Sequence, residues 1–276
     1  MPRDQLPANL VYGVNSVAVA LDSGQLRVLF FDAGRQSERT QQLHARALVD
    51  GVEVQPLARQ GFSRALPADQ HQGVAGLIHE PHRYFLEEIV GVAAEDSCVL
   101  VLDRVQDPQN LGAVLRTAAA GGVDAVVLPK AGACPVTPAV HKAAAGLSLI
   151  VPIVEDENLA RALEFLKGHG YWAIGCDSER GEDALTFEYP HRRVIVMGNE
   201  TEGMRRLVRE GCDYIVRIPM AKGVDSLNIS AATAVVLYLA KADLARAAYD
   251  ATHGTAEPAP ADEPESDADG SGSSST

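Results

Sequence analysis

The sequence predicts an α/β protein in which a small N-terminal α/β unit precedes a larger domain built on a mostly parallel sheet. Two observations predict this fold class. Short apolar runs alternate with helical patterns through the second half of the chain, as they do where helices cover a parallel sheet. A shorter set of such patterns precedes them, and a charged stretch that contains Pro81 separates the two sets.

The N-terminal unit is expected over residues 1–78, and residues 79–96 have the composition of a linker with one short helix. The apolar spacing over Gly13–Leu21 predicts a helix. The strand candidates are apolar runs bounded by turn residues, namely Leu26–Phe31, Val52–Pro56 and Gly73–Ile78. These elements are enough for one small domain with its own core.

The larger domain is expected over residues 97–250. Its strands are predicted at Cys98–Leu102, Val123–Leu128, Leu149–Val154, Tyr171–Cys176, Val194–Met197 and Tyr214–Ile218. Its helices are predicted at Asn110–Ala120, Asn158–Lys167, Met204–Glu210 and about Ser226–Tyr249. The first half of the last helix is apolar almost all round, which indicates burial against another element or a second subunit. Ligands of such sheets bind at the carboxyl ends of the strands.

The charge of the chain does not favour a nucleic-acid partner. Its formal net charge is −13, whereas phosphate binding needs local lysine and arginine. Residues 251–276 carry six acidic residues and no lysine or arginine, so −13 + 6 leaves −7 for the rest. The Pro, Ala, Ser, Gly and acidic composition of this segment cannot bury a core, and we expect a disordered acidic tail.

The sequence has no pattern typical of a membrane, secreted or metal-binding protein. The first residues lack the basic and apolar regions of a signal peptide, and no apolar run reaches the roughly 18 residues of a membrane span. The cysteines Cys98, Cys134, Cys176 and Cys212 lie far apart and form no zinc-ligand pattern. We therefore expect a cytoplasmic protein with reduced thiols and no metal.

Two loops that follow predicted strands concentrate glycine, proline and polar residues. The first, residues 102–116, places Asn110 where a helix N-cap would be and Arg116 on the helix that follows. The second, residues 194–204, runs through Gly198 to a helix, and its glycines let the backbone approach a ligand closely. Each has an ordinary alternative: Asn110 caps a helix, and Glu200 or Glu202 complements the N-terminus of a helix.

A third loop, residues 218–230, also joins a predicted strand to a predicted helix. Ser226 is a plausible N-cap of that helix, which is its ordinary alternative. Asn228 is expected in the first turn of an otherwise apolar helix, where its amide needs a partner. The sequence therefore marks three strand-to-helix loops as candidate sites.

Together the three loops resemble the three motifs of the SpoU (TrmH-like) RNA 2′-O-methyltransferase family, over about Val99–Leu239. The motifs are N-L-G-A-x-x-R, M-G-x-E-x-x-G-M and I-P-M-x-x-x-x-S-L-N-x-S. The resemblance implies the SPOUT fold with a deep trefoil knot, a rare exception to the rule that chains do not thread loops. It also implies a homodimer that uses S-adenosyl-L-methionine, cradled by the main chain of Gly198, Ile218 and Leu227.

The N-terminal unit resembles the ribosomal-protein-L30e-like substrate domain of the family branch that methylates 23S rRNA. The matching segments are Val11–Val17 and His71–Ala75. The resemblance implies 2′-O-methylation of a guanosine ribose in 23S rRNA, with the peptidyl-transferase P loop as the expected site. A small α/β core with a buried, hydrogen-bonded His71 is the alternative explanation of the two segments.

The resemblance assigns a polar catalytic set, namely Asn110, Arg116, Glu200, Ser226 and Asn228. The family assigns the matching arginine as the base that takes the hydroxyl proton. A guanidinium has a pKa above about 12 and is effectively always charged in proteins. We therefore expect Arg116 to grip a phosphate and stabilise the developing alkoxide, with Glu200 orienting Arg116 or a substrate group.

Asn110 and Arg116 are six residues apart, so they face different directions on one helix. Assembly of the site across a dimer would accommodate this.

Three alternatives differ in class. A tRNA ribose methyltransferase of the same family shares the motifs, but such enzymes usually have short helical extensions in place of the L30e-like unit. A non-catalytic RNA-binding protein would have no need of the polar set. An oxidoreductase or a nucleotide hydrolase lacks support because the sequence contains no G-x-G-x-x-G or Walker loop.

Overall fold

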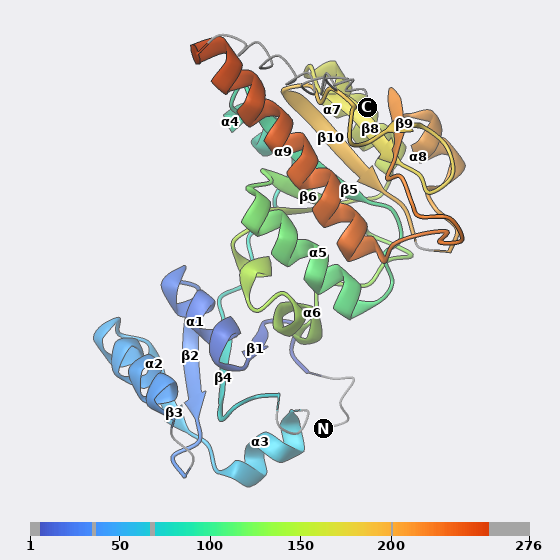
Figure 1. Ribbon diagram of the computed structural model, residues 1–276. Coiled ribbons are helices and arrows are strands. Elements are labelled where there is room, and N and C mark those ends of the chain that lie inside the picture. Colours follow the sequence, from blue (N-terminus) through green and yellow to red (C-terminus); the bar gives the residue numbers. More distant parts are fainter. Residues whose placement is uncertain (1–5, 35–36, 67–69, 200, 254–276) are drawn as a thin grey trace, which may run out of the picture.

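The structure is a computed structural model that describes residues 6–34, 37–66, 70–199 and 201–253 of the 276-residue chain. It contains two sheets, and helices pack against both faces of each (Figure 1). The expected α/β class with a small N-terminal domain and a parallel sheet is confirmed. The predicted acidic tail lies outside the described residues from residue 254 onward.

The N-terminal sheet has the strand order β1-β4-β2-β3. Only β2 and β3 run parallel; β4 is antiparallel to both of its neighbours. Its elements are β1 Leu10–Tyr12, α1 Val14–Asp22, β2 Leu26–Phe31, α2 Glu38–Val49, β3 Glu53–Pro56, α3 Arg59–Ala65 and β4 Val74–Ile78. The helices α1 and α2 cover one face, and Phe62 of α3 packs on the other. The structure adds β1, α2 and α3 to the predicted elements.

One short helix, α4 Leu86–Val92, lies in the connection between the two sheets, as expected. The Glu88 carboxylate accepts a hydrogen bond from the Phe85 main-chain N–H at 2.8 Å, which satisfies a free N–H group at the helix start. This bond and the neighbouring His82 lower the pKa of Glu88.

The larger sheet has seven strands in the order β7-β6-β5-β10-β8-β11-β9, and all six pairings are parallel. The strands are β5 Ser97–Leu102, β6 Ala125–Pro129, β7 Ile153–Asp156, β8 Trp172–Cys176, β9 Glu182–Asp183, β10 Arg192–Met197 and β11 Tyr214–Arg217. The strand order changes direction at β5, because β6 and β7 lie on one side of it and β10 and the remaining strands lie on the other. Crevices at such positions bind ligands in α/β sheets.

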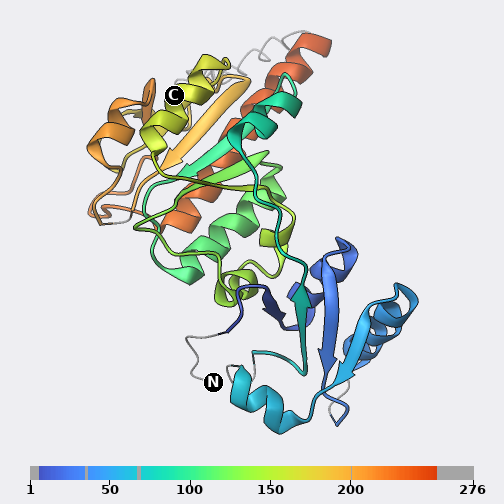
Figure 2. The same cartoon turned by 180° about the vertical axis from the view of Figure 1, so that it is seen from behind.

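Alternation along the buried strands divides the core into two layers. Leu100 and Leu102 of β5 face α5 Pro108–Gly121, α6 Pro138–Ala143 and α9 Ile229–His253. Val99 and Val101 face the opposite layer of α4, α7 Leu159–Gly168 and α8 Arg206–Glu210. Figures 1 and 2 show these two layers from opposite sides. Burial on both faces explains why the strands are apolar throughout.

The predicted strand at Leu149–Val154 is wrong in its first half. Gly146 takes a φ of +90° and starts a short 3-10 helix, η2 Leu147–Leu149, so that β7 begins only at Ile153. An apolar run of this length does not by itself distinguish a strand from a helical turn. The trefoil knot stays a prediction, because strand order and register do not define how the chain threads.

The two domains contact each other through α1 and β1 on one side and α6 and η2 on the other (Figure 1). Ser16 Oγ donates to the His141 carbonyl at 3.3 Å, and Gln25 Nε2 donates to the Leu149 carbonyl at 2.8 Å. Gly146 is packed so closely that a Cβ would stand 2.7 Å from the Ser16 Cα. The domain contact therefore depends on a residue without a side chain.

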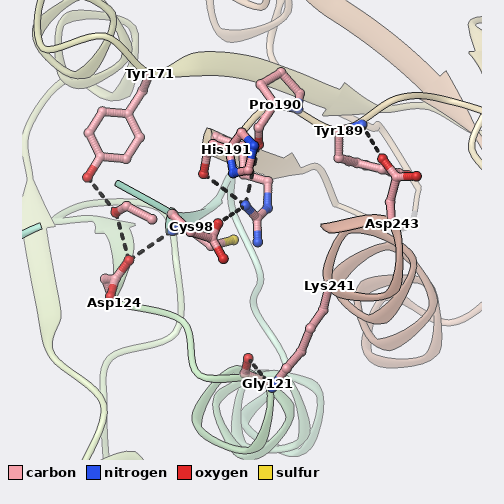
Figure 3. Close-up of polar contacts among 12 residues, drawn as sticks. Cys98, Gly121, Asp124, Tyr171, Tyr189, Pro190, His191, Lys241 and Asp243 are labelled. Atoms are coloured by element: carbon pink, nitrogen blue, oxygen red, sulfur yellow. Dashed lines mark hydrogen bonds and ion pairs between the residues drawn. The ribbon is translucent and has the colours of Figure 1, made fainter. Parts of the chain in front are cut away.

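A polar cluster lies at the amino ends of the parallel strands (Figure 3). The Asp124 carboxylate accepts from the Cys98 main-chain N–H at 2.8 Å and from Ser97 Oγ at 2.7 Å, and Ser97 Oγ lies 2.6 Å from the Tyr171 hydroxyl. The buried Arg193 binds Asp96 at 2.6 Å. These hydrogen bonds and this ion pair lie at the end of the sheet away from the predicted ligand site, which indicates a structural role.

Within the part of the chain that the structure describes, no helix is long and apolar enough to cross a membrane.

Candidate active site

The three loops singled out in the sequence follow β5, β10 and β11 at the carboxyl edge of the large sheet. Sheet register pairs Leu102 with Met197, so the first two loops leave adjacent strands side by side. Figures 1 and 2 both show the loop after β11 beside the loop after β10. The expected position of the site at this edge agrees with the rule for parallel sheets.

Asn110 lies in the first turn of α5 and is not its N-cap. The cap is Asp107, whose carboxylate accepts from the Asn110 main-chain N–H at 3.0 Å, and Pro108 takes the first helical position. The prediction of an Asn110 cap was wrong because Asp-Pro is the stronger start signal. The Asn110 side chain is thereby free of the capping role, and its Oδ1 accepts from Asn228 Nδ2 at 2.9 Å.

Asn228 stands immediately before α9, which starts at Ile229 and not at about Ser226. Its Oδ1 accepts from the Ser230 main-chain N–H at 2.9 Å and from Ser230 Oγ at 2.6 Å, so Asn228 does the capping predicted for Ser226. Ser226 is exposed, and no polar contact of its side chain is recorded within the described ranges. The amide of Asn228 therefore joins α9 to α5 across 118 residues of sequence.

The loop after β10 folds back on itself. The main chains of Asn199 and Gly203 exchange two hydrogen bonds of 3.1 and 2.8 Å, and Gly203 has a φ of +65°, which favours glycine. A Cβ on Gly198 would collide with the main chain of Gly203 and Met204. Glu200, the member of the predicted polar set that this loop contributes, lies outside the described residues.

The other two predicted cofactor residues lie in the loop after β11. Ile218 directly follows the strand and is half-buried, and Leu227 is an exposed apolar residue just before α9. Together with Gly198 they present main chain and apolar surface at one edge of the sheet. The close-packed Gly198 and the exposed Leu227 fit a cofactor held by main-chain groups and an apolar surface.

Arg116 is exposed on α5, about 9 Å along the helix axis from Asn110. No polar contact of its side chain is recorded within the described segments. The structure therefore brings Asn110 and Asn228 together within one chain and does not bring Arg116 to them.

Sequence reasoning missed two residues that hold the first two loops together. Asp103, fully buried after β5, accepts from the Arg205 main-chain N–H and from Arg205 Nε, both at 2.7 Å. Arg104 takes a φ of +66°, and its carbonyl accepts from Asn199 Nδ2 at 3.1 Å. An aspartate at the end of an otherwise apolar strand was the only available signal, because the partners are about a hundred residues away.

The cysteines do not supply reactive groups to this edge. Burial raises the pKa of Cys98 to about 11, and it raises the pKa values of Cys176 and Cys212 to about 12. A thiol with such a pKa is almost fully protonated at neutral pH and is a weak nucleophile. Among the described residues, no three His, Cys, Asp or Glu side chains gather as metal ligands would.

Two family descriptions match the chain. Residues 97–238 match the SpoU rRNA Methylase family, and residues 10–84 match the description "RNA 2′-O ribose methyltransferase substrate binding". The first match spans the large sheet and the three loops, and the second spans the four-stranded sheet.

Curated relatives match both domains at once. The 23S rRNA (guanosine-2′-O-)-methyltransferase RlmB of Pseudomonas putida is 39% identical over 233 residues, which are 83% of this chain and 94% of that protein. RlmB of Yersinia pestis is 36% identical over 235 residues, 84% of this chain and 96% of that protein.

Solved structures superpose on most of the chain. The SpoU methyltransferase AviRb from Streptomyces viridochromogenes, in complex with AdoMet, superposes with a TM-score of 0.73 at 25% identity and covers 86% of this chain and 90% of its own. An AdoMet-bound rRNA methyltransferase from Sinorhizobium meliloti superposes with a TM-score of 0.70 at 26% identity. The match covers 85% of this chain and 87% of that protein.

The parallel sheet, the loops at its carboxyl edge and the additional α/β domain define an RNA ribose 2′-O-methyltransferase with a substrate-binding domain. The chain belongs to the SpoU rRNA methylase family. Its cofactor is S-adenosyl-L-methionine, as the resemblance implied.

Proposed function

We propose that this protein methylates the 2′-oxygen of a guanosine ribose in 23S rRNA, with the peptidyl-transferase P loop as its site. The relatives named RlmB support this substrate because they match over both domains. We assign residues 1–78 to RNA binding, residues 79–96 to the linker and residues 97–250 to catalysis. A ribosomal RNA substrate supports a cytoplasmic location for the protein.

The observation that carries the proposal is the link between Asn110 and Asn228 at the carboxyl edge of the sheet. It brings the polar side chains of the first and third motifs within hydrogen-bond distance of each other, which supports a shared polar site. When bound, S-adenosyl-L-methionine supplies an electrophilic methyl group on a sulfonium. The chain must then position the ribose hydroxyl and stabilise the negative charge that develops on its oxygen.

We assign cofactor binding to the main chain of Gly198, Ile218 and Leu227. The close approach of Gly198 to Gly203 and Met204 supports this, because any side chain there would push the loop open. Asn110, Ser226, Asn228 and Glu200 are assigned to the polar frame around the hydroxyl. The amide groups of Asn110 and Asn228 and the hydroxyl of Ser226 can hydrogen-bond to the ribose hydroxyl. They do so without adding a negative charge near the RNA phosphates.

Arg116 is assigned to a phosphate of the RNA and to the developing alkoxide. Its exposure on α5 supports a contact with a partner outside the chain. Replacement of Arg116 by lysine keeps the charge and removes the planar fork of donors. We expect the methylation rate to fall about 100-fold with RNA affinity nearly unchanged. A near-full rate with lysine would exclude a role that needs the fork geometry.

We further propose a homodimer in which Arg116 of one subunit completes the site of the other. The different directions of Asn110 and Arg116 on α5 support this arrangement. Mixing an Arg116→Ala protein with an Asn110→Ala protein tests it. Mixed dimers contain one site with both residues intact, so activity should return although each variant alone is inactive. No recovery in verified mixed dimers would mean that each chain builds its own site.

The tRNA alternative is less well supported. The A. aeolicus TrmH/SpoU tRNA modifying enzyme covers 59% of this chain, at a TM-score of 0.51. Ribose methylation mapped in 23S rRNA and tRNA from a deletion strain, with and without the cloned gene, decides between the substrates. A calorimetric titration with S-adenosyl-L-methionine addresses the non-catalytic alternative, since an enzyme must bind its methyl donor.

A further inference from the structure

Asp103 and Arg104, the two residues that follow β5, bind both the first and the last residues of the loop after β10. The neighbouring strands end in register, so Asp103 and Gly198 are the next residues on adjacent strands. The Asp103 main-chain N–H donates to the Met197 carbonyl at 2.8 Å, which extends this pairing by one step. The loop that approaches the cofactor therefore starts directly beside Asp103.

The far arm of the same loop is held by the Asp103 carboxylate. One oxygen accepts from the Arg205 main-chain N–H and the other accepts from Arg205 Nε, each at 2.7 Å. The Asp103 side chain has no exposed surface, so its charge is stabilised by these bonds and not by water. Charge-assisted bonds of this kind are short and directional, and a buried carboxylate that loses its partner is strongly destabilised.

Arg104 holds the tip of the loop. Its carbonyl accepts from Asn199 Nδ2 at 3.1 Å, and its Nη1 lies 2.7 Å from Glu202 Oε2. Arg104 makes these contacts from a left-handed backbone conformation, which is unfavourable for a residue with a side chain. Strained conformations of this kind occur where surrounding contacts over-determine them, and they cluster at functional sites.

We propose that Asp103, acting through Arg205, is a positioning residue that holds the described part of the loop after β10, residues 198–199 and 201–205, in the conformation that binds S-adenosyl-L-methionine. Among the described residues, the loop's own hydrogen bonds are the main-chain pair between Asn199 and Gly203 and the two that Asn199 Oδ1 accepts from the main-chain N–H groups of Thr201 and Glu202. None of these bonds involves Arg205. Without the anchor at Arg205, the main chain of Gly203 and Met204 can move away from Gly198. Preorganisation lowers the ordering cost of binding, so loss of the anchor weakens the cofactor complex. The inference rests on the proposed cofactor role of Gly198.

The test compares Asp103→Asn with a matched control on the neighbouring pair. Asparagine has nearly the shape of aspartate, but it lacks the charge and presents an NH2 group to one of the two Arg205 donors. The control is Arg206→Ala, which removes the exposed ion pair of Arg206 with Glu210 on α8. S-adenosyl-L-methionine binding is measured by calorimetry without RNA, together with amide hydrogen exchange of residues 198–205 and the melting temperature.

We expect Asp103→Asn to weaken S-adenosyl-L-methionine binding about 10- to 100-fold and to speed amide exchange in the loop. The KM for the cofactor should rise by a similar factor, while kcat at saturating cofactor changes less. Arg206→Ala should match the wild type in all of these measurements. A folded Asp103→Asn protein with wild-type affinity and wild-type loop exchange would overturn the inference.

A second variant covers the case in which Asp103→Asn does not fold. Arg205→Ala keeps the main-chain N–H bond to Asp103 and removes only the Nε bond, so we expect a smaller loss of affinity, about 3- to 10-fold. Wild-type affinity in Arg205→Ala would then overturn the inference. Failure of the wild type itself to bind the cofactor would instead contradict the proposed function, which keeps the two failures distinguishable.

Discussion

Asn228 illustrates how one side chain serves two elements. Its Oδ1 caps α9 through Ser230, while its Nδ2 donates to Asn110 on α5. The residue that begins the helix therefore also fixes the distance between two predicted catalytic loops. A cap supplied by Ser226, three positions before Ile229, would leave Asn228 inside the helix and turn its amide elsewhere.

Alanine at position 228 should lower the free energy of unfolding by about 1 kcal/mol, because the first turn of α9 loses its cap. The matched control is Ser226→Ala, which should change stability by less than about 0.5 kcal/mol since the Ser226 side chain is exposed. Urea unfolding of both variants checks this. Equal losses at the two positions would show that Ser226 shares the cap.

At the scale of elements, α5 and α6 pack backbone against backbone. A Cβ on Gly112 would stand 2.9 Å from the Ala144 nitrogen and 2.9 Å from the Val140 oxygen. Neither atom can move without moving α6. Gly121, at the other end of α5, has open space where a Cβ would be. The same helix thus offers one glycine required by packing and one that packing does not require.

We expect Gly112→Ala to destabilise the protein by about 1–3 kcal/mol despite the higher helix propensity of alanine, because α6 must shift. The matched control, Gly121→Ala, should be neutral or stabilising by up to about 1 kcal/mol. Thermal unfolding followed by circular dichroism distinguishes the two. A stable Gly112→Ala protein would mean that α6 adjusts freely, contrary to the packing described.

At the scale of the whole molecule, the domain contact decides how the RNA-binding part faces the catalytic edge. It joins α6 and η2 of one domain to β1 and α1 of the other, and Lys142 Nζ lies 3.5 Å from Gln72 Oε1 within it. Partial burial in this contact lowers the pKa of Lys142. The close approach of Gly146 to Ser16 makes the contact sensitive to a single methyl group.

Replacement of Gly146 by alanine should therefore loosen the two domains. We expect a larger radius of gyration in small-angle scattering, a higher KM for rRNA and an unchanged affinity for S-adenosyl-L-methionine. Gly132→Ala is the control, because Gly132 also has a positive φ, +76°, but no neighbour within 4 Å of a Cβ. If both variants behave alike, backbone strain and not the domain contact causes the effect.

The stability of the folded protein should depend on pH through His141, whose carbonyl takes part in the domain contact. Burial lowers the pKa of His141 from 6.5 to about 4, and its Nδ1 lies 2.8 Å from Ser148 Oγ. The unfolded chain therefore binds a proton between pH 6.5 and 4 that the folded chain does not bind. The contribution of neutral, buried His141 to the free energy of unfolding is fully present above pH 6.5. That free energy should fall by about 3 kcal/mol as the pH drops to 4. Denaturant titrations of wild type and His141→Gln check this, since the variant should lose that slope.

The sequence by itself determined the types of most elements and their approximate positions. Apolar periodicity and the Gly and Pro signals are local properties, and they located β5, β8, β10 and α5 to within a few residues. The three loops and the family resemblance were also readable, because motif spacing is a property of the linear chain. Local patterns could not separate η2 from a strand, since a short apolar run suits either.

Only the tertiary structure decided which residues hold those elements together. The insertion of β10 between β5 and β8, the choice of Asn228 over Ser226 as a cap, and the anchoring of Arg205 by Asp103 all join residues far apart in sequence. Asp103 and Arg205 are separated by 102 positions, and Asn110 and Asn228 by 118. A hydrogen bond depends on positions within about 3 Å, and folding of the whole chain sets those positions.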